Sequence, residues 1–158
     1  MRRVVSSATP LIAFARANRP DILHKLYGEI TVPEAVLAEI EREPVRTHVR
    51  DASWIRVVPV GDSSERKMFS AKLHAGEVEV MILARELRAD LLLMDDNAAK
   101  KTAKFLGFAV VGSFGILLKA KREGVITEVR GLMDSMIADG LYASPGFRQM
   151  VLEEAGEA

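Results

Sequence analysis

Residues 91–101 read LLLMDDNAAKK, and this stretch decides what kind of sheet the chain builds. Four apolar residues run without a break and end on two adjacent aspartates. A continuous apolar run is typical of a strand that is buried on both faces, as in a parallel sheet. Two neighbouring carboxylates repel each other by about 1 kcal/mol even in water. We therefore expect a bound cation, or good solvation, to offset the repulsion between Asp95 and Asp96.

Segments typical of strands and of helices alternate along the rest of the chain. Strands are predicted at residues 2–7, 29–32, 54–60, 90–94 and 108–112. Helices are predicted at 9–17, 20–28, 33–43, 66–89, 97–107, 113–124, 128–138 and 145–154. In the first helix we expect Thr9 as the N-cap and Pro10 in the first position, and in the fourth a break near Gly76. This alternation predicts an α/β sandwich with a mostly parallel sheet, folded as a single domain over residues 1–158.

The composition limits the classes of function. Lys plus Arg and Asp plus Glu both number 22, so no overall field attracts nucleic acid or a membrane surface. The chain has no cysteine for a disulfide or a thiolate metal site, and its three histidines are far apart in sequence. No apolar run approaches the length of a membrane span. The basic N-terminus turns apolar only briefly, so we do not predict a signal peptide and expect a cytoplasmic protein.

Acidic side chains collect where the predicted strands end. Ligands of parallel sheets bind beyond the carboxyl ends of the strands, and here Asp95 and Asp96 follow one strand directly. Glutamates of the helices at 33–43 and 66–89 can reach the same edge. Clustered oxygens of this kind suit Mg²⁺ or Mn²⁺. Either aspartate can instead serve as the N-cap of the next helix, and one can cap while the other faces a site.

Helical spacing separates some of these glutamates but not all. Glu77 lies beside the apolar stripe of its helix, whereas Glu79 lies further toward the solvated side. A carboxylate at the edge of a core needs a partner, so Glu77 is the better ligand candidate. In the preceding helix Glu34, Glu39 and Glu41 flank the apolar stripe at similar angles, and spacing does not choose among them.

Three segments, in this order, resemble the PIN-domain proteins: VVSSATPLIAFA (4–15), VPEAVLAEIE (32–41) and the run from LHAGEVEV to LLKAKREG (73–124). The closer likeness is to a branch of unknown function whose members are predicted to bind nucleic acid. The resemblance implies a three-layer α/β/α sandwich with a central parallel sheet. Many PIN domains are ribonucleases that use Mg²⁺ or Mn²⁺ at three or four acids. Many are toxins of toxin–antitoxin pairs, and many form homodimers.

The resemblance also assigns site residues. It places the catalytic and metal-binding acids at Glu39, Glu77 and Asp95, with Asp96 as the immediate alternative to Asp95. It places at Thr9 the hydroxyl that follows the first acid, near the nucleic acid.

The chain departs from the PIN pattern at the end of the first strand. Members commonly carry aspartate or asparagine there, as a direct metal ligand, whereas this chain has Ser7. A neutral hydroxyl is a weak ligand for Mg²⁺, so we expect weak metal binding, and hydrolysis is put in doubt. If the site is inactive, Ser7 is simply a small polar residue in a turn.

Basic residues follow the same strand ends. Lys100 and Lys101 lie on the helix after Asp96, and Arg42, Arg46 and Arg50 follow Glu39. They can contact RNA phosphates, or they can form ordinary solvated faces. His74 precedes the glutamate-rich helix, but a lone histidine is more often structural, and we do not assign it to the site.

Two functions stay open at this point. One is a metal-dependent endoribonuclease, which as a toxin would pair with a small antitoxin protein. The other is a domain that binds RNA or a protein partner without cutting. Apolar residues after Phe114 suggest a homodimer, or else they complete the core; they are Leu117, Leu118, Ile126, Leu132 and Met136.

Overall fold

A five-stranded parallel sheet forms the centre of the protein in a computed structural model, which describes residues 2–158. The strands are β1 (Val4–Ser6), β2 (Ile30–Pro33), β3 (Ile55–Val58), β4 (Leu91–Leu93) and β5 (Val110–Val111). They lie in the order β3-β2-β1-β4-β5, and every neighbouring pair is parallel. The predicted α/β sandwich with a parallel sheet is confirmed, and β1 is its central strand, between β2 and β4.

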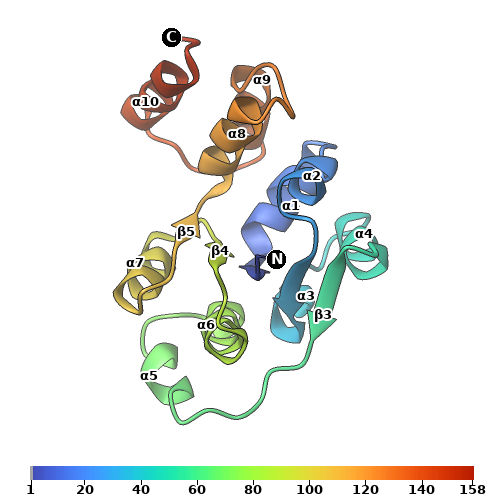
Figure 1. The fold of residues 1–158 in the computed structure, drawn as a ribbon, viewed down its shortest axis with the longest axis vertical. Coiled ribbons are helices and arrows are strands. Elements are labelled where there is room, and N and C mark those ends of the chain that lie inside the picture. The colour runs from blue at the N-terminus through green and yellow to red at the C-terminus, as the bar shows by residue number, and fades with distance from the viewer. Residues whose placement is uncertain (1) are drawn as a thin grey trace.

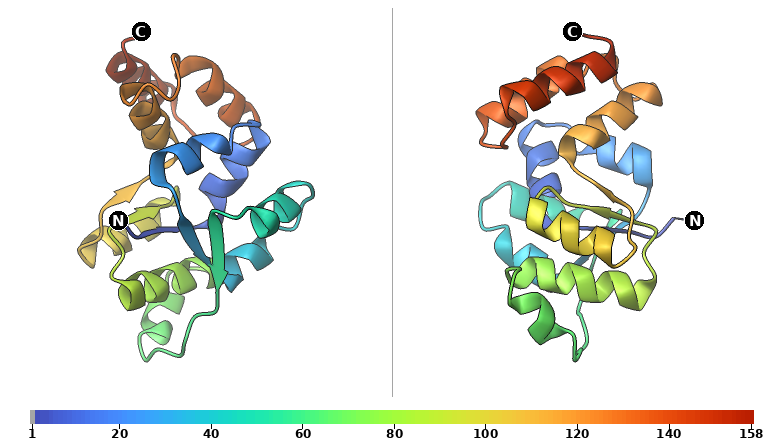
Figure 2. Two further views of the ribbon diagram at one scale, coloured as in Figure 1. Left: turned by 45° about the vertical axis from the view of Figure 1, so that its right-hand side comes forward. Right: turned by 90° about the vertical axis from the view of Figure 1, so that its left-hand side faces the viewer.

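Helices cover both faces of the sheet (Figure 1). They are α1 (Ala8–Arg16), α2 (Asp21–Tyr27), α3 (Glu34–Glu39), α4 (Val45–Asp51), α5 (Arg66–Ser70), α6 (Ala75–Leu87), α7 (Asn97–Phe105), α8 (Ser113–Arg122), α9 (Arg130–Ala138) and α10 (Pro145–Ala155). In Figure 1, α1, α2 and α8–α10 lie above the strands, while α5 and α6 lie below. The C-terminal helices and α5 therefore occupy opposite ends of the molecule (Figure 2). None of the helices within residues 2–158 has the length and apolar character to cross a membrane.

The strand at residues 91–93 is buried as its sequence predicts. Leu92 and Leu93 are fully buried, and Met94, directly after the strand, is also in the core. Its register aligns Val5 with Leu92 and Ser6 with Leu93. The residues that follow β1 and β4, Ser7 and Asp95, are therefore delivered to the same edge of the sheet.

Some predicted boundaries are wrong. Thr9 is not an N-cap: α1 begins at Ala8, and Ser7 is the residue before it. Pro10 fits inside this first turn because the first N–H groups of a helix need no partner within it. The predicted helix at 33–43 stops at Glu39, and the separate helix α4 follows Pro44. By contrast, the expected break near Gly76 is present, since α5 ends at Ser70 and α6 begins at Ala75.

The C-terminal apolar residues mainly fill the core. Leu117, Ile126 and Met136 are buried, and Leu118 and Leu132 are partly buried against the same cluster. The apolar surplus therefore completes the sandwich and no longer argues for a homodimer.

Candidate functional site

An acid-lined hollow of about 270 Å³ opens at the carboxyl ends of β1 and β4. Its lining consists of Ser7, Ala8, Thr9, Glu39, His74, Glu77, Asp95 and Asp96. Ser7 and Thr9 come from the β1–α1 junction, Glu39 from the end of α3 and Glu77 from the first turn of α6. Six of the residues predicted from the sequence are thus brought together, while Lys100 and Lys101 line other cavities.

Glu77 is the buried carboxylate of the hollow, with 5% of its surface exposed. Burial raises the pKa of Glu77 above its ordinary value, and the negative charges of Asp96 and Glu39 raise it further, while His74 opposes them. Glu79 is half-buried instead and forms an ion pair with Arg66 at 3.1 Å. The difference that helical spacing predicted between these two glutamates is confirmed.

His74 joins two of the acids, although sequence reasoning left it unassigned. Its Nδ1 lies 3.4 Å from Glu39 Oε1, and its Nε2 lies 3.2 Å from Glu77 Oε2. His74 is the residue before α6, so its side chain and that of Glu77 lie three positions apart on one side of the first turn. That spacing was the available signal, but the contact with Glu39 is made only by the fold.

Gly76 makes room for Glu39. A Cβ at position 76 would overlap Oε1 of Glu39 and would lie 2.5 Å from its Cδ and 3.1 Å from its Oε2. The carboxylate of α3 therefore rests directly on the backbone of α6. Any side chain at this position would push Glu39 out of its present place.

The two adjacent aspartates both serve at helix starts. Asp96 is the N-cap of α7, and its Oδ2 accepts a hydrogen bond from the Ala99 N–H at 2.9 Å. Asp95 accepts from Ser113 twice, at 2.8 Å from the backbone N–H and at 2.7 Å from Oγ–H. The capping interpretation is confirmed for Asp96. Ser113, fully buried at the start of α8, is a supporting residue that sequence reasoning treated only as a helix start.

The hydroxyl of Ser7 is engaged with the backbone. Ser7 is 8% exposed, and its N–H and Oγ–H both donate to the carbonyl of Leu93, at 2.9 and 3.2 Å. Ser7 thus lies at the hollow and ties β1 to β4. An oxygen lone pair remains on the hydroxyl, but no charge is present.

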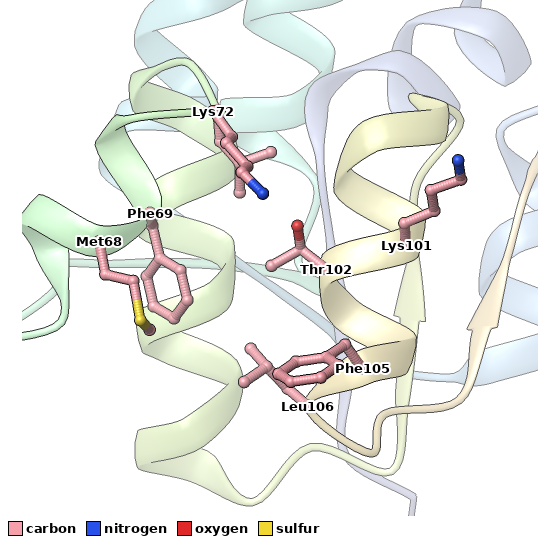
Figure 3. Close-up of a pocket in the computed structure, with 8 residues that line it drawn as sticks. Met68, Phe69, Lys72, Lys101, Thr102, Phe105 and Leu106 are labelled. Atoms are coloured by element: carbon pink, nitrogen blue, oxygen red, sulfur yellow. The ribbon is translucent and has the colours of Figure 1, made fainter.

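The two lysines that were predicted to contact RNA line different cavities. Lys100 lines a cavity that also contains Asp95 and Asp96, whereas Lys101 lines an apolar cavity of about 430 Å³ between α5 and α7 (Figure 3). Figure 3 shows Met68 and Phe69 of α5 facing Phe105, the last residue of α7, and Leu106, the residue after it, across that second cavity.

The arginines after Glu39 serve mainly local structure. Arg46 donates to the carbonyls of Leu37 and Ile40, and Arg50 is paired with Asp51. These two guanidinium groups are therefore already engaged by neighbouring protein groups.

The donor chemistry of the hollow fits a hard divalent cation. Four carboxylates line it, and oxygen ligands of this kind suit Mg²⁺ or Mn²⁺. Among residues 2–158, no three Asp, Glu or His side chains are already arranged closely enough to hold an ion. A cation would have to draw Glu39 and Glu77 away from His74.

Glu77→Gln should stabilise the protein at alkaline pH. Between the ordinary pKa and the raised one, folded Glu77 keeps a proton that the unfolded chain releases, so wild-type stability falls as pH rises through this window. Removing the buried charge relieves like-charge repulsion of about 1 kcal/mol, which corresponds to a rise of about 2–4 °C in Tm. Thermal unfolding from pH 4 to pH 8 measures the difference, which should shrink at low pH. Glu79→Gln is the control, and a Glu77→Gln protein less stable than wild type at pH 8 would contradict the prediction.

Comparison with known proteins identifies the family to which the chain belongs. A family model described as a PIN domain, DUF3368, matches residues 3–157. No curated protein matches the sequence. Because that family model spans nearly the whole chain, the protein belongs to the PIN-domain family, in a branch whose function is unknown.

Proposed function

We propose that the acid-lined hollow is the active site of an endoribonuclease that uses Mg²⁺ or Mn²⁺. PIN domains have a nuclease-type fold and generally use these ions. The observation that carries the proposal is the meeting of Glu39, Glu77, Asp95 and Asp96 around one cavity at the carboxyl ends of parallel strands. Like charges gathered at a partly buried site are costly unless a bound cation offsets them.

The four acids share one role in this proposal, and other residues support them. Glu39, Glu77, Asp95 and Asp96 would hold the cation, which when bound supplies positive charge against the phosphate and lowers the pKa of water. Ser113 orients the Asp95 carboxylate through two hydrogen bonds. Glu39 and Glu77 would exchange their contacts with His74 for contacts with the cation.

A second function, binding RNA or a protein partner without cutting, is favoured by three contacts. The Ser7 hydroxyl donates to the Leu93 carbonyl. Both oxygens of Asp95 accept from Ser113, and His74 lies between Glu39 and Glu77. With these partners the polar side chains named here have hydrogen-bond or ionic partners without a cation. One negative charge of the usual PIN set is also missing.

The partners follow from the family. PIN-domain nucleases typically bind RNA or other nucleic acid, and we propose RNA as the substrate here. A toxin role, with a small antitoxin protein as partner, and assembly as a homodimer rest on the PIN likeness alone.

Removing single acids from the hollow should weaken Mn²⁺ binding and RNA cleavage together. Losing even an outer-shell partner of a metal commonly costs about 10- to 100-fold in affinity or activity. We therefore expect at least a tenfold loss in Asp95→Asn, Asp96→Asn and Glu77→Gln. Titration calorimetry with Mn²⁺, and cleavage of a panel of single-stranded RNAs, measure the two effects.

Glu79→Gln is the matched control, because it removes a neighbouring carboxylate of the same helix that does not line the hollow. If wild type and Asp95→Asn release equal heats on titration with Mn²⁺, Asp95 is not a metal ligand and Asp96 takes that role. A wild-type protein that neither binds Mn²⁺ nor cleaves RNA would end the nuclease proposal in favour of the non-catalytic function.

A further inference from the structure

A larger cavity adjoins the acid-lined hollow on the side of the C-terminal helix. It measures about 670 Å³ and lies between α7, the start of α8 and the segment that leads into α10. Asp95 and Asp96 line both spaces, so the two are adjacent at these residues. A ligand that reaches the acids therefore extends naturally into this larger cavity, which we call the aromatic cavity.

Two exposed aromatic rings line the aromatic cavity. Tyr142 has 83% of its surface exposed and Phe147 has 44%. The Phe147 ring packs against Phe114, with 6.0 Å between the ring centroids. Exposed apolar side chains that cluster at a hollow, rather than lying singly on the surface, are a mark of a binding site. Here both stand beside the candidate active site.

The Phe147 ring is carried by a fixed part of the fold. Ser144 is the N-cap of α10 and accepts the Phe147 N–H at 3.1 Å. Arg148, one residue further, donates twice to Asp134 of α9, at 2.8 and 2.9 Å. The helix start that positions Phe147 is therefore held both within α10 and against α9.

Polar groups of the aromatic cavity suit a nucleotide. Lys100 supplies an ammonium group and Asn97 an amide that both donates and accepts. Gly112 leaves room for Lys100 and Asp95: a Cβ at that position would lie 2.7 Å from Lys100 Nζ and 2.9 Å from Asp95 Oδ1. The ammonium is thus held at the boundary between the acids and the aromatic rings.

We propose that the aromatic cavity binds an unpaired nucleobase of single-stranded RNA, stacked on Tyr142 and Phe147, with Lys100 at the adjoining phosphate. This inference rests on the proposed function, because it places the nucleotide next to the phosphate that the acids would cleave. Stacking uses the uncharged face of a base and is tolerant of sequence, and Lys100 offsets the charge of the adjoining phosphate. An RNA duplex cannot use the cavity, since its bases are stacked on one another.

Tyr142→Ala should weaken binding of single-stranded RNA roughly tenfold, which is about 1.4 kcal/mol. The probe is a fluorescein-labelled ten-nucleotide RNA, followed by fluorescence anisotropy in Ca²⁺ and in EDTA and checked to be intact on a gel. Tyr142→Phe keeps the ring and should bind within about twofold of wild type. Phe105→Ala is the matched control, because Phe105 is 89% exposed but lines the separate cavity between α5 and α7.

Tyr142→Trp provides a second readout. A tryptophan that stacks on a base loses fluorescence, so the signal above that of the native Trp54 should fall on addition of RNA and stay constant with duplex RNA. Duplex binding should be equal in wild type and Tyr142→Ala. An equal loss on duplex RNA, no binding of single strands by wild type, or a change of sedimentation in Tyr142→Ala without a change in RNA affinity would overturn the proposal.

The outcome separates this inference from the proposed function. If Tyr142→Ala loses RNA affinity but wild type never cleaves RNA in Mn²⁺, the stacking site stands and the nuclease proposal fails. If wild type cleaves RNA and Tyr142→Ala keeps both its affinity and its KM, the nuclease proposal stands and the stacking site is wrong.

Discussion

Gly76→Ala should remove most Mn²⁺-dependent RNA cleavage while leaving the protein at least as stable as the wild type. The new Cβ would overlap Oε1 of Glu39, so that carboxylate has to leave its place on α6. The displaced group is the end of a flexible side chain, and moving it costs little. Alanine is also preferred over glycine in a helix by up to about 1 kcal/mol. Stability and activity should therefore change in opposite directions.

The comparison needs chemical denaturation for stability and cleavage of single-stranded RNA for activity. Gly131→Ala is the matched control: Gly131 is also the second residue of its helix, and a Cβ there would meet nothing within 4 Å. It should leave cleavage unchanged. In a Glu39→Ala background, Gly76→Ala has no carboxylate to displace and should cause no further loss. Full activity in Gly76→Ala alone would show that the position of Glu39 is not needed for catalysis.

The sheet could be predicted from the sequence because its signals are local. The apolar run at residues 91–94 needs burial on both faces, and its alternation with helical segments leaves few arrangements other than parallel strands. The burial of Glu77 followed from one helical stripe in the same way. Helix boundaries were less certain, because the serine and threonine at 7 and 9 are equally good caps in sequence and only packing chooses between them.

The detail of the site could not be predicted because it depends on contacts between distant segments. Ser113 meets Asp95 across 18 positions of sequence, and His74 meets Glu39 across 35. Lys100 and Lys101 are neighbours in sequence, but the turn of α7 directs them into different cavities. No periodicity within one segment contains this information.

The adjacent aspartates are explained by the same geometry. β4 ends beside the first residues of two helices, whose N–H groups need hydrogen-bond acceptors. Asp96 caps α7, and Asp95 accepts a hydrogen bond from the first residue of α8. Each carboxylate then still lines the acid-lined hollow. Backbone and hydroxyl donors offset part of the repulsion between the two carboxylates. A cation therefore has less repulsion to offset than the sequence alone indicated.

Ser7→Asp should destabilise the metal-free protein and increase metal-dependent cleavage. A carboxylate at position 7 joins Glu77, Asp95 and Asp96 at the hollow and loses the hydrogen bond that Ser7 donates to Leu93. Repulsion and the loss of the hydroxyl hydrogen bond together should lower the free energy of unfolding by about 1–3 kcal/mol, although the N–H of residue 7 still donates to the Leu93 carbonyl. Mn²⁺ at about 100 times its Kd should return about 2.7 kcal/mol, because it binds only the folded state. Denaturation with and without Mn²⁺ measures both changes.

Cleavage of the single-stranded RNA panel in Mn²⁺ should rise above wild type in Ser7→Asp, because the fifth carboxylate adds a charged oxygen ligand at the hollow. Ser7→Asn is the matched control: its amide can still donate to the Leu93 carbonyl, and it adds an oxygen without a charge. It should therefore cost less stability and gain less from Mn²⁺. Ser7→Asp combined with Glu77→Gln should lose the gain in cleavage, since the fifth acid then acts without its buried partner. If Ser7→Asp gains neither Mn²⁺-dependent stability nor cleavage, position 7 does not reach the cation. If the wild type already cleaves RNA strongly, the four native acids suffice and the hydroxyl of Ser7 is only a tie between β1 and β4.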